Sequence, residues 1–204
     1  SHAVNTGIRA SLGEVLLFLH ADVMLAPHTV EDMLDVLIEN PVTGAVTVAA
    51  PRTYEWGTYQ PDAAYRTWDE FVAVTEDVRA RESKKHLPMI VAELYALMAR
   101  RDVVEAAGFL DEAYSVPALA AYDYTVRMTR AGYGIALLPR VYVHHDASIH
   151  VQEMEEYDAL RMQEREHFHV KWGISLDYSF MIRLELLPLM DLKREGLRVL
   201  EIGC

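Results

Sequence analysis

The chain has 204 residues, of which 51% are hydrophobic, and its formal net charge at pH 7 is −12. This length and hydrophobic content suffice for a globular domain with a sizeable core, whereas the acidic surface repels polyanions and excludes nucleic acid as an expected partner. No apolar run approaches the roughly 18 residues that cross a bilayer, and the amino terminus has no signal pattern, so we expect a cytoplasmic protein without a transmembrane segment.

Predicted helices and strands alternate along most of the sequence. Helical periodicity and capping signals predict helices over residues 3–10, 27–39, 62–85, 101–107, 122–131 and 152–172. Short apolar runs predict strands over residues 14–20, 44–50, 89–98, 135–138 and 141–145. This alternation predicts an α/β fold, with helices on the faces of a sheet.

The predicted strand over residues 14–20 leads into two polar residues, His20 and Asp22. Side chains alternate along a strand, so these two point the same way while Ala21 points back into the protein. Ligands of open α/β sheets bind at the carboxyl ends of strands, which makes the pair a candidate half of a metal site. An ordinary Asp turn after the strand is the alternative interpretation. Cys204 is the only cysteine, so histidines and carboxylates are the candidate ligands.

A series of short motifs, taken in order, resembles the family 2 glycosyltransferases with the GT-A fold. The motifs lie between residues 3 and 173 and include VNTGIRA (4–10), LFLHAD (17–22), RRDVV (100–104), YDYTVR (122–127), VHH (143–145) and KWG (171–173). Each string alone is weak, and it is their order that is specific. The resemblance implies a partial GT-A-like, Rossmann-like mixed sheet flanked by helices, with a C-terminal helical extension.

The resemblance also implies transfer of a sugar from a nucleotide-diphosphate donor to an acceptor hydroxyl, with Mn²⁺ or Mg²⁺ on the diphosphate. Donor binding is then expected at Asn5, His20 and Asp22, because LHAD stands where the family has Asp-x-Asp. Metal binding is expected at Asp22, together with His144 and His145 from a neighbouring strand. A divalent ion on the phosphate oxygens offsets the charge that grows on the leaving diphosphate, and both ligand types suit Mn²⁺.

Two departures from the family's pattern concern the chemistry. His20 replaces the first Asp of Asp-x-Asp, which removes a negative charge but keeps a possible ligand. Ala120 and Ala121 stand where the family's acidic motif carries a Glu-Asp pair, so the usual general base is absent. Asp123 is the candidate catalytic base instead, and stabilisation of a helix amino terminus is its alternative role. A catalytically degenerate binding module therefore stands as the alternative to an active transferase.

The resemblance divides the chain into three parts. Residues 1–173 form a glycosyltransferase-like domain whose first βαβ segment is expected before Ser1, and residues 174–196 form a helical connector. Residues 197–204 (LRVLEIGC) resemble the first strand of class I S-adenosylmethionine-dependent methyltransferases, which implies a fused methyltransferase domain in a longer protein. The donor sugar and the acceptor are not specified by the sequence.

Overall fold

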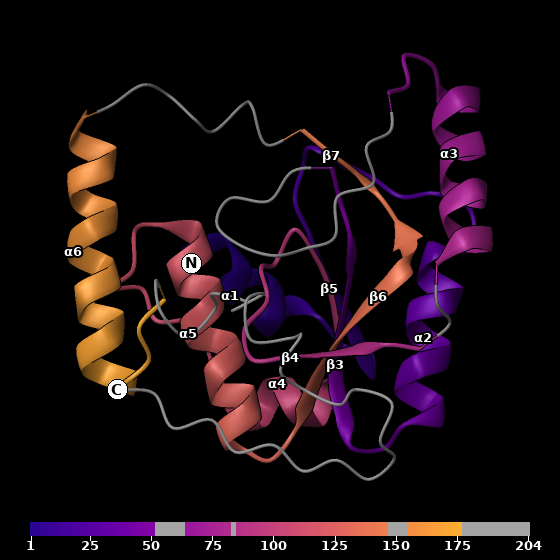
Figure 1. Cartoon of the computed structure of the whole chain (residues 1–204). Helices are drawn as coiled ribbons and strands as arrows, with labels where there is room; N and C mark the ends of the chain where they lie inside the picture. Colours follow the sequence, from indigo (N-terminus) through magenta and orange to yellow (C-terminus); the bar gives the residue numbers. More distant parts are fainter. Residues whose placement is uncertain (52–63, 83–84, 147–154, 177–204) are drawn as a thin grey trace, which may run out of the picture.

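The computed structural model describes residues 1–51, 64–82, 85–146 and 155–176 (Figure 1). The helices are α1 (His2–Ala10), α2 (Thr29–Glu39), α3 (Trp68–Arg81), α4 (Arg101–Ala107), α5 (Pro117–Arg130) and α6 (Glu155–Trp172). The strands are β1 (Val15–Leu19), β2 (Val23–Met24), β3 (Thr43–Ala49), β4 (Leu87–Met89), β5 (Ala96–Arg100), β6 (Gly134–Tyr142) and β7 (His144–His145). The predicted α/β fold is confirmed.

Five of the strands form one mixed sheet, in the order β1-β5-β3-β6-β4. Strand β5 runs antiparallel to both of its neighbours, β1 and β3, whereas β3 and β6 are parallel. Strands β1, β3 and β6 therefore point the same way and present their carboxyl ends at one edge of the sheet. Ligand sites of α/β sheets are found at such an edge.

Helices cover both faces of the sheet. Leu16 and Phe18 of β1 belong to a core shared with α4, α5 and α6, whereas Val15 and Leu17 pack on the opposite side, with the core that includes Met33 of α2. In Figure 1, α5 and α6 lie to the left of the sheet and α2 and α3 to its right. None of the helices in the described ranges combines the length and apolar character that crossing a bilayer requires.

The predicted single strand over residues 89–98 is wrong. The structure has two strands there, since β4 pairs with β6 at one edge of the sheet and β5 lies between β1 and β3. The chain leaves the sheet over residues 90–95 to pass from one position to the other. This connection is itself buried from Val91 to Tyr95, so its sequence is as apolar as that of a strand.

The two predicted strands over residues 135–138 and 141–145 are divided differently in the structure. Strand β6 continues through residues 139–140 to Tyr142, with an irregularity between the pairs Val48–Leu138 and Ala49–Tyr142. Such a bulge accommodates Pro139, which has no amide hydrogen for a regular ladder. The short strand β7 then follows as a separate element that pairs with β2.

Helix α5 begins five residues earlier than the predicted helix over residues 122–131, because Pro117 opens its first turn. Asp123 consequently lies in the second turn and not in the first, so the alternative role of Asp123 as a helix-terminus group is wrong. Ala120 and Ala121 also lie inside α5, and both are buried.

The predicted carboxyl-terminal parts lie largely outside the described residues. Helix α6 ends at Trp172 and Gly173 follows with φ 68°. The predicted helical connector over residues 174–196 is described only to Leu176, and the methyltransferase-like strand over residues 197–204 lies entirely outside the described ranges. Both remain predictions.

Candidate metal centre

A tight turn after β1 places His20 and Asp22 at the carboxyl edge of the sheet. The backbone amide of His20 donates to the carbonyl of Tyr95 (2.9 Å), and the amide of Val23 donates to the carbonyl of His20 (3.2 Å). Strand β2 then pairs with β7, with Val23 opposite His145, and the amide of Asp146 donates to the Asp22 carbonyl (3.2 Å). This pairing brings His145 to the turn.

The side chains of His20, Asp22 and His145 converge. One nitrogen from each imidazole and one carboxylate oxygen all lie within 4.8 Å of one another. Nε2 of His145 lies 3.7 Å from Oδ2 of Asp22, and the ring centroids of the two histidines are 5.7 Å apart. The side chain of His145 is fully buried and that of Asp22 is 5% exposed. Two imidazoles and a carboxylate are ligand types that suit Mn²⁺ and its neighbours among the transition metals.

His145 is held in place by Tyr95. The two rings stack with centroids 4.9 Å apart and planes 14° apart, and Tyr95 is fully buried. The Tyr95 hydroxyl donates to the backbone carbonyl of Val48 in β3, which fixes the tyrosine to the sheet. The orientation of the His145 ring is therefore set by the core. Sequence reasoning missed Tyr95, because the apolar pattern around it gives no sign that its ring meets a histidine 50 residues later.

His144 lies on the other side of the β7 backbone from His145. Its Nδ1 shares a hydrogen bond of 2.6 Å with the Tyr65 hydroxyl, and its ring meets the edge of Phe71 in α3. Adjacent side chains of a strand point to opposite faces, so only one histidine of the pair can join the centre. The structure brings His145 to His20 and Asp22 and places His144 against α3.

Asn5 of α1 is 1% exposed and joins that helix to the loop after α4. Its side-chain amide donates to the Leu110 carbonyl (3.0 Å) and to a carboxylate oxygen of Glu112 (2.9 Å). Its side-chain oxygen accepts from the Leu110 amide at 2.8 Å. Both ends of the Asn5 side chain are therefore bound to the protein, and a role in donor binding remains a prediction.

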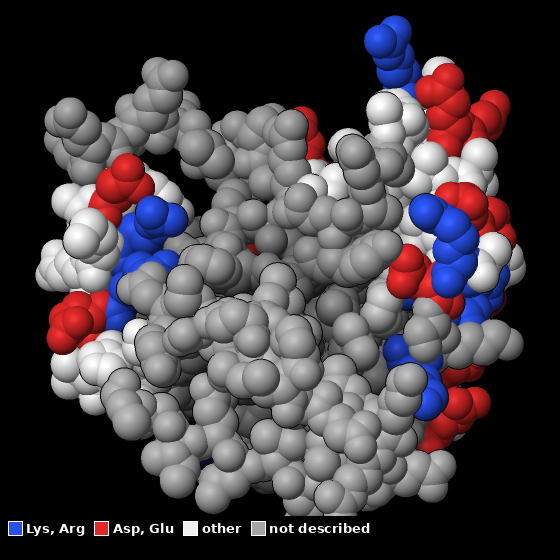
Figure 2. All heavy atoms as spheres, in the orientation of Figure 1, with Lys and Arg blue, Asp and Glu red and all other residues white. Residues whose placement is uncertain are grey.

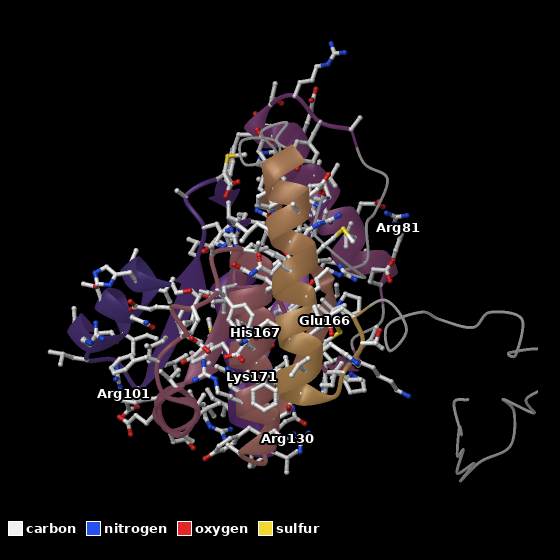
Figure 3. The ribbon with its side chains drawn as sticks, turned by 90° about the vertical axis from the view of Figure 1, so that its left-hand side faces the viewer. Arg81, Arg101, Arg130, Glu166, His167 and Lys171 are labelled. Carbon is white, nitrogen blue, oxygen red and sulfur yellow. The ribbon has the colours of Figure 1, made fainter. Side chains whose placement is uncertain are left out.

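Asp123 is fully buried between α5 and α6. Its carboxylate accepts from Nε of Arg127 (3.0 Å) and from Nε1 of Trp172 (2.9 Å), and it lies 2.7 Å from Nζ of Lys171. Lys171, labelled on α6 in Figure 3, also bonds to Asp111 at 2.9 Å. The contact with Arg127 lies within α5, whereas those with Lys171 and Trp172 join α5 to α6 and have no local signal in the sequence.

At this α5–α6 junction, where Asp123, Lys171 and Asp111 meet, the opposite charges stabilise one another. The hydrogen bond from Lys171 holds the pKa of the Asp111 carboxyl below its usual value of 3.8. Burial by itself would lower the pKa of the Lys171 ammonium, but its bonds to Asp111 and Asp123 outweigh burial and raise that pKa above 10.5. Lys171 therefore stays charged over the whole physiological range.

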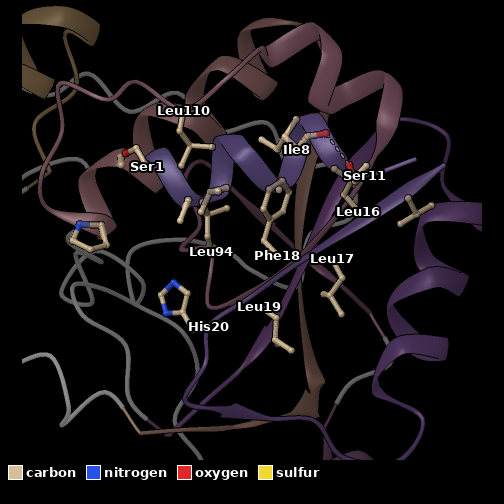
Figure 4. A pocket seen from close by; sticks show the side chains of 16 residues that line it. Ser1, Ile8, Ser11, Leu16, Leu17, Phe18, Leu19, His20, Leu94 and Leu110 are labelled. Atoms are coloured by element: carbon tan, nitrogen blue, oxygen red, sulfur yellow. Dashed lines mark hydrogen bonds between the residues drawn. The ribbon is translucent and has the colours of Figure 1, made fainter. Parts of the chain in front are cut away.

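An apolar cavity of about 540 Å³ runs along β1, next to the centre. Figure 4 shows Phe18, Leu94 and His20 among its labelled lining residues, and Ala120 of α5 also contributes. His20 thus belongs both to the polar cluster and to the cavity wall. On the face of the molecule in Figure 2, acidic and basic side chains are interspersed over α6 and α3.

This mixed sheet between helices, with a cluster of possible metal ligands at its carboxyl edge, has the GT-A-like architecture. The model of the family described as Glycosyl transferase family 2 matches residues 1–105, which is about half of the sequence. The chain belongs to this family.

Two solved structures illustrate the shared fold. The mannosyltransferase PcManGT from Pyrobaculum calidifontis, in complex with GDP-Man and Mn²⁺, is 20% identical over 83% of this chain, with a TM-score of 0.51. GalNAc-T7, with UDP, GalNAc and Mn²⁺, is 14% identical over 91% of this chain, with a TM-score of 0.50. The chain spans 42% and 40% of the lengths of these two proteins. Among curated proteins, none matches the chain by sequence.

Proposed function

We propose that this chain is part of a metal-dependent glycosyltransferase, which transfers a sugar from a nucleotide-diphosphate donor to an acceptor hydroxyl. The observation that carries the proposal is the convergence of His20, Asp22 and His145 at the carboxyl edge of a family 2 sheet. The two similar structures named above hold GDP-Man or UDP together with Mn²⁺, which supports the same ligand classes here.

The three side chains suit Mn²⁺ better than an ion that binds only oxygen ligands, because two of the three ligands are imidazoles. A bound Mn²⁺ or Mg²⁺ would neutralise charge on the departing diphosphate. Asp22 supplies the negative charge that holds the ion, and His145 supplies a nitrogen fixed by the Tyr95 ring. His20 stands at the border of the cavity, where it can orient the diphosphate as well as bind the ion.

For Asp123 we propose a positioning role instead of the role of general base. A base has to reach the proton of the acceptor hydroxyl, and the Asp123 carboxylate is fully buried, with Arg127, Lys171 and Trp172 around it. Its contacts hold α6 against α5. The buried Ala120 and Ala121 provide no acidic group next to it.

A direct test is calorimetric titration of the intact protein with UDP and with GDP, each with and without Mn²⁺. We expect binding of at least one nucleotide that depends on Mn²⁺ and is lost in Asp22→Ala. Asp35→Ala, which removes an exposed carboxylate of α2, is the matched control and should bind as the wild type does. Binding that is equally strong without metal would contradict the proposal.

The second candidate function is a binding module without catalysis, which the alanines at positions 120 and 121 favour. Both candidates predict metal-dependent nucleotide binding, so turnover separates them. Release of sugar from UDP- or GDP-sugars in the presence of Mn²⁺, abolished by Asp22→Ala, would establish the transferase. Binding without any release of sugar would establish the module.

A further inference from the structure

We infer that His20, Asp22 and His145 bind a transition-metal ion before any nucleotide arrives, and that they select such an ion over Mg²⁺. The inference deepens the proposed function and rests on it, because it concerns the same three residues. It adds an order of binding and a choice of metal, neither of which follows from a single Asp at the edge of a sheet.

The number of protein ligands supports binding in the absence of nucleotide. An ion held by one carboxylate needs phosphate oxygens to complete its surroundings, as is common for Mg²⁺ sites. Here three ligand groups come from the chain itself, and their ligand atoms lie within 4.8 Å of one another. Three protein ligands are also the number found in many catalytic zinc sites, which keep a remaining position open for water or substrate.

The distances leave little rearrangement to be made. Two ligand atoms that share an ion at about 2.1 Å from each cannot be more than about 4.2 Å apart. The 3.7 Å between His145 Nε2 and Asp22 Oδ2 already satisfies this limit. All three ligand atoms lie within 4.8 Å of one another, so no pair exceeds the limit by more than about 0.6 Å, which a small side-chain rotation removes.

The surrounding structure holds the ring of His145 and the backbone that carries His20 and Asp22. His145 is stacked on Tyr95, whose hydroxyl is bound to β3. The backbones on either side of the centre are joined by the hydrogen bonds from His20 to Tyr95 and from Asp146 to Asp22. Little conformational entropy is then lost when an ion binds, which favours binding without help from a nucleotide.

The ligand types support selection against Mg²⁺. Mg²⁺ demands oxygen ligands in near-ideal octahedral geometry and sheds its waters reluctantly. Imidazole nitrogens instead favour the later first-row ions, for which affinity rises from Mn²⁺ through Fe²⁺ and Co²⁺ to Ni²⁺. His20 is decisive, because an Asp at this position would make the centre two carboxylates and one imidazole, a set much closer to the preference of Mg²⁺.

The test uses Co²⁺ alone as the probe, added to the intact, nucleotide-free protein and followed by visible absorption and calorimetry. We expect one Co²⁺ per chain, with an absorption spectrum altered from that of the aqueous ion by nitrogen ligation, and retention of Co²⁺ in a 100-fold excess of Mg²⁺. His20→Ala should weaken Co²⁺ binding by at least about tenfold. His20→Asp should reduce the preference for Co²⁺ over Mg²⁺ by at least about tenfold as well.

The matched control is His144→Ala, which removes the neighbouring histidine that faces Tyr65. It should bind Co²⁺ as the wild type does, and circular dichroism establishes that each variant is folded.

Co²⁺ binding only after UDP or GDP is added would overturn the inference while leaving the proposed function intact. Displacement of Co²⁺ by equimolar Mg²⁺, or equal losses in His20→Ala and His144→Ala, would also overturn it. Co²⁺ binding without any metal-dependent nucleotide binding would instead support this site and contradict the proposed function.

Discussion

Asp22 at the edge of the sheet and Asp123 between α5 and α6 are both nearly inaccessible carboxylates, but their surroundings contrast. The side chain of Asp123 is fully buried, and that of Asp22 is 5% exposed. Asp123 is surrounded by the cations of Arg127 and Lys171 and by the indole of Trp172. Asp22 faces the imidazole of His145, with Oδ2 of Asp22 at 3.7 Å from Nε2 of His145.

Burial of the same residue type therefore leads to different roles in the two places. A buried carboxylate is costly unless charges and donors compensate for it, and for Asp123 the fold supplies them directly. Asp22 is instead placed among groups that can themselves ligate a cation. We therefore expect substitution of Asp123 to change stability and substitution of Asp22 to change binding.

Asp123→Ala should have the largest effect. It leaves Arg127 and Lys171 without the carboxylate between them, and loss of one member of a buried ion pair costs about 3 kcal/mol. Urea denaturation measures this loss as a lower free energy of unfolding. Asp102→Ala, which removes an exposed partner of Arg100, is the control and should change the free energy by less than about 1 kcal/mol. A folded Asp123→Ala protein of wild-type stability with abolished sugar transfer would restore Asp123 as the base.

Asp22→Ala should weaken Mn²⁺ binding by at least about 100-fold, because even loss of an outer partner of a ligand costs about 10–100-fold. Its free energy of unfolding should change by less than that of Asp123→Ala. The free Mn²⁺ signal in electron paramagnetic resonance measures the affinity. If Asp22→Ala unfolded at much lower urea concentrations and bound Mn²⁺ normally, the contrast between the two carboxylates would be reversed.

Tyr95→Leu should weaken Mn²⁺ binding by about tenfold, because the ring that holds His145 is lost while all three ligands remain. Tyr95→Phe keeps the stacked ring and removes the bond to the Val48 carbonyl. It should leave the Mn²⁺ affinity within about threefold and cost about 1 kcal/mol of stability. Equal affinities for the Leu and Phe variants would show that stacking does not orient the histidine.

The smallest expected effect concerns acid sensitivity at the α5–α6 junction. The pKa of Asp111 is lower in the folded protein than its usual 3.8, so its contribution to stability is present above pH 3.8 and is lost as the pH falls through the folded-state value. Asp111 and Lys171 are each about one-third exposed, which limits this contribution to less than about 1 kcal/mol.

Asp111→Asn should therefore be slightly less stable than the wild type at pH 7, and the two proteins should converge as the pH falls below 3.8. Urea denaturation at a series of pH values measures this difference. A difference that persisted unchanged in acid would mean that the amide disturbs the junction for reasons other than charge.

The sequence predicted the fold well where the signals were local. Apolar runs and capping residues located most helices and strands, and the helix predicted over residues 101–107 matches α4, which ends before Gly108. The alternation argument selected the right pair, His20 and Asp22, but the structure brings the two side chains together in a turn after β1, which ends at Leu19, and not along a strand. Pro117 is a local signal for the early start of α5, but the predicted helix began only at residue 122.

The remaining features depend on pairing between distant segments. The register between β2 and β7 sets Val23 opposite His145, and this register decides which histidine of β7 joins the centre. The register cannot be predicted from two adjacent histidines in the sequence. The stacking of Tyr95 on His145 joins residues 50 positions apart. The hydrogen bond between Asp123 and Trp172 joins residues 49 positions apart in the sequence, and it forms only because α5 packs against α6.

The central claim, that His20, Asp22 and His145 form one metal centre, is tested most directly by anomalous diffraction from crystals of the intact protein grown with Mn²⁺ and UDP. We expect an anomalous peak about 2.0–2.3 Å from a carboxylate oxygen of Asp22 and a ring nitrogen of His145, with the His20 ring turned towards it. A peak at a different group of residues, or an ordered nucleotide with no peak among these three side chains, would contradict the claim.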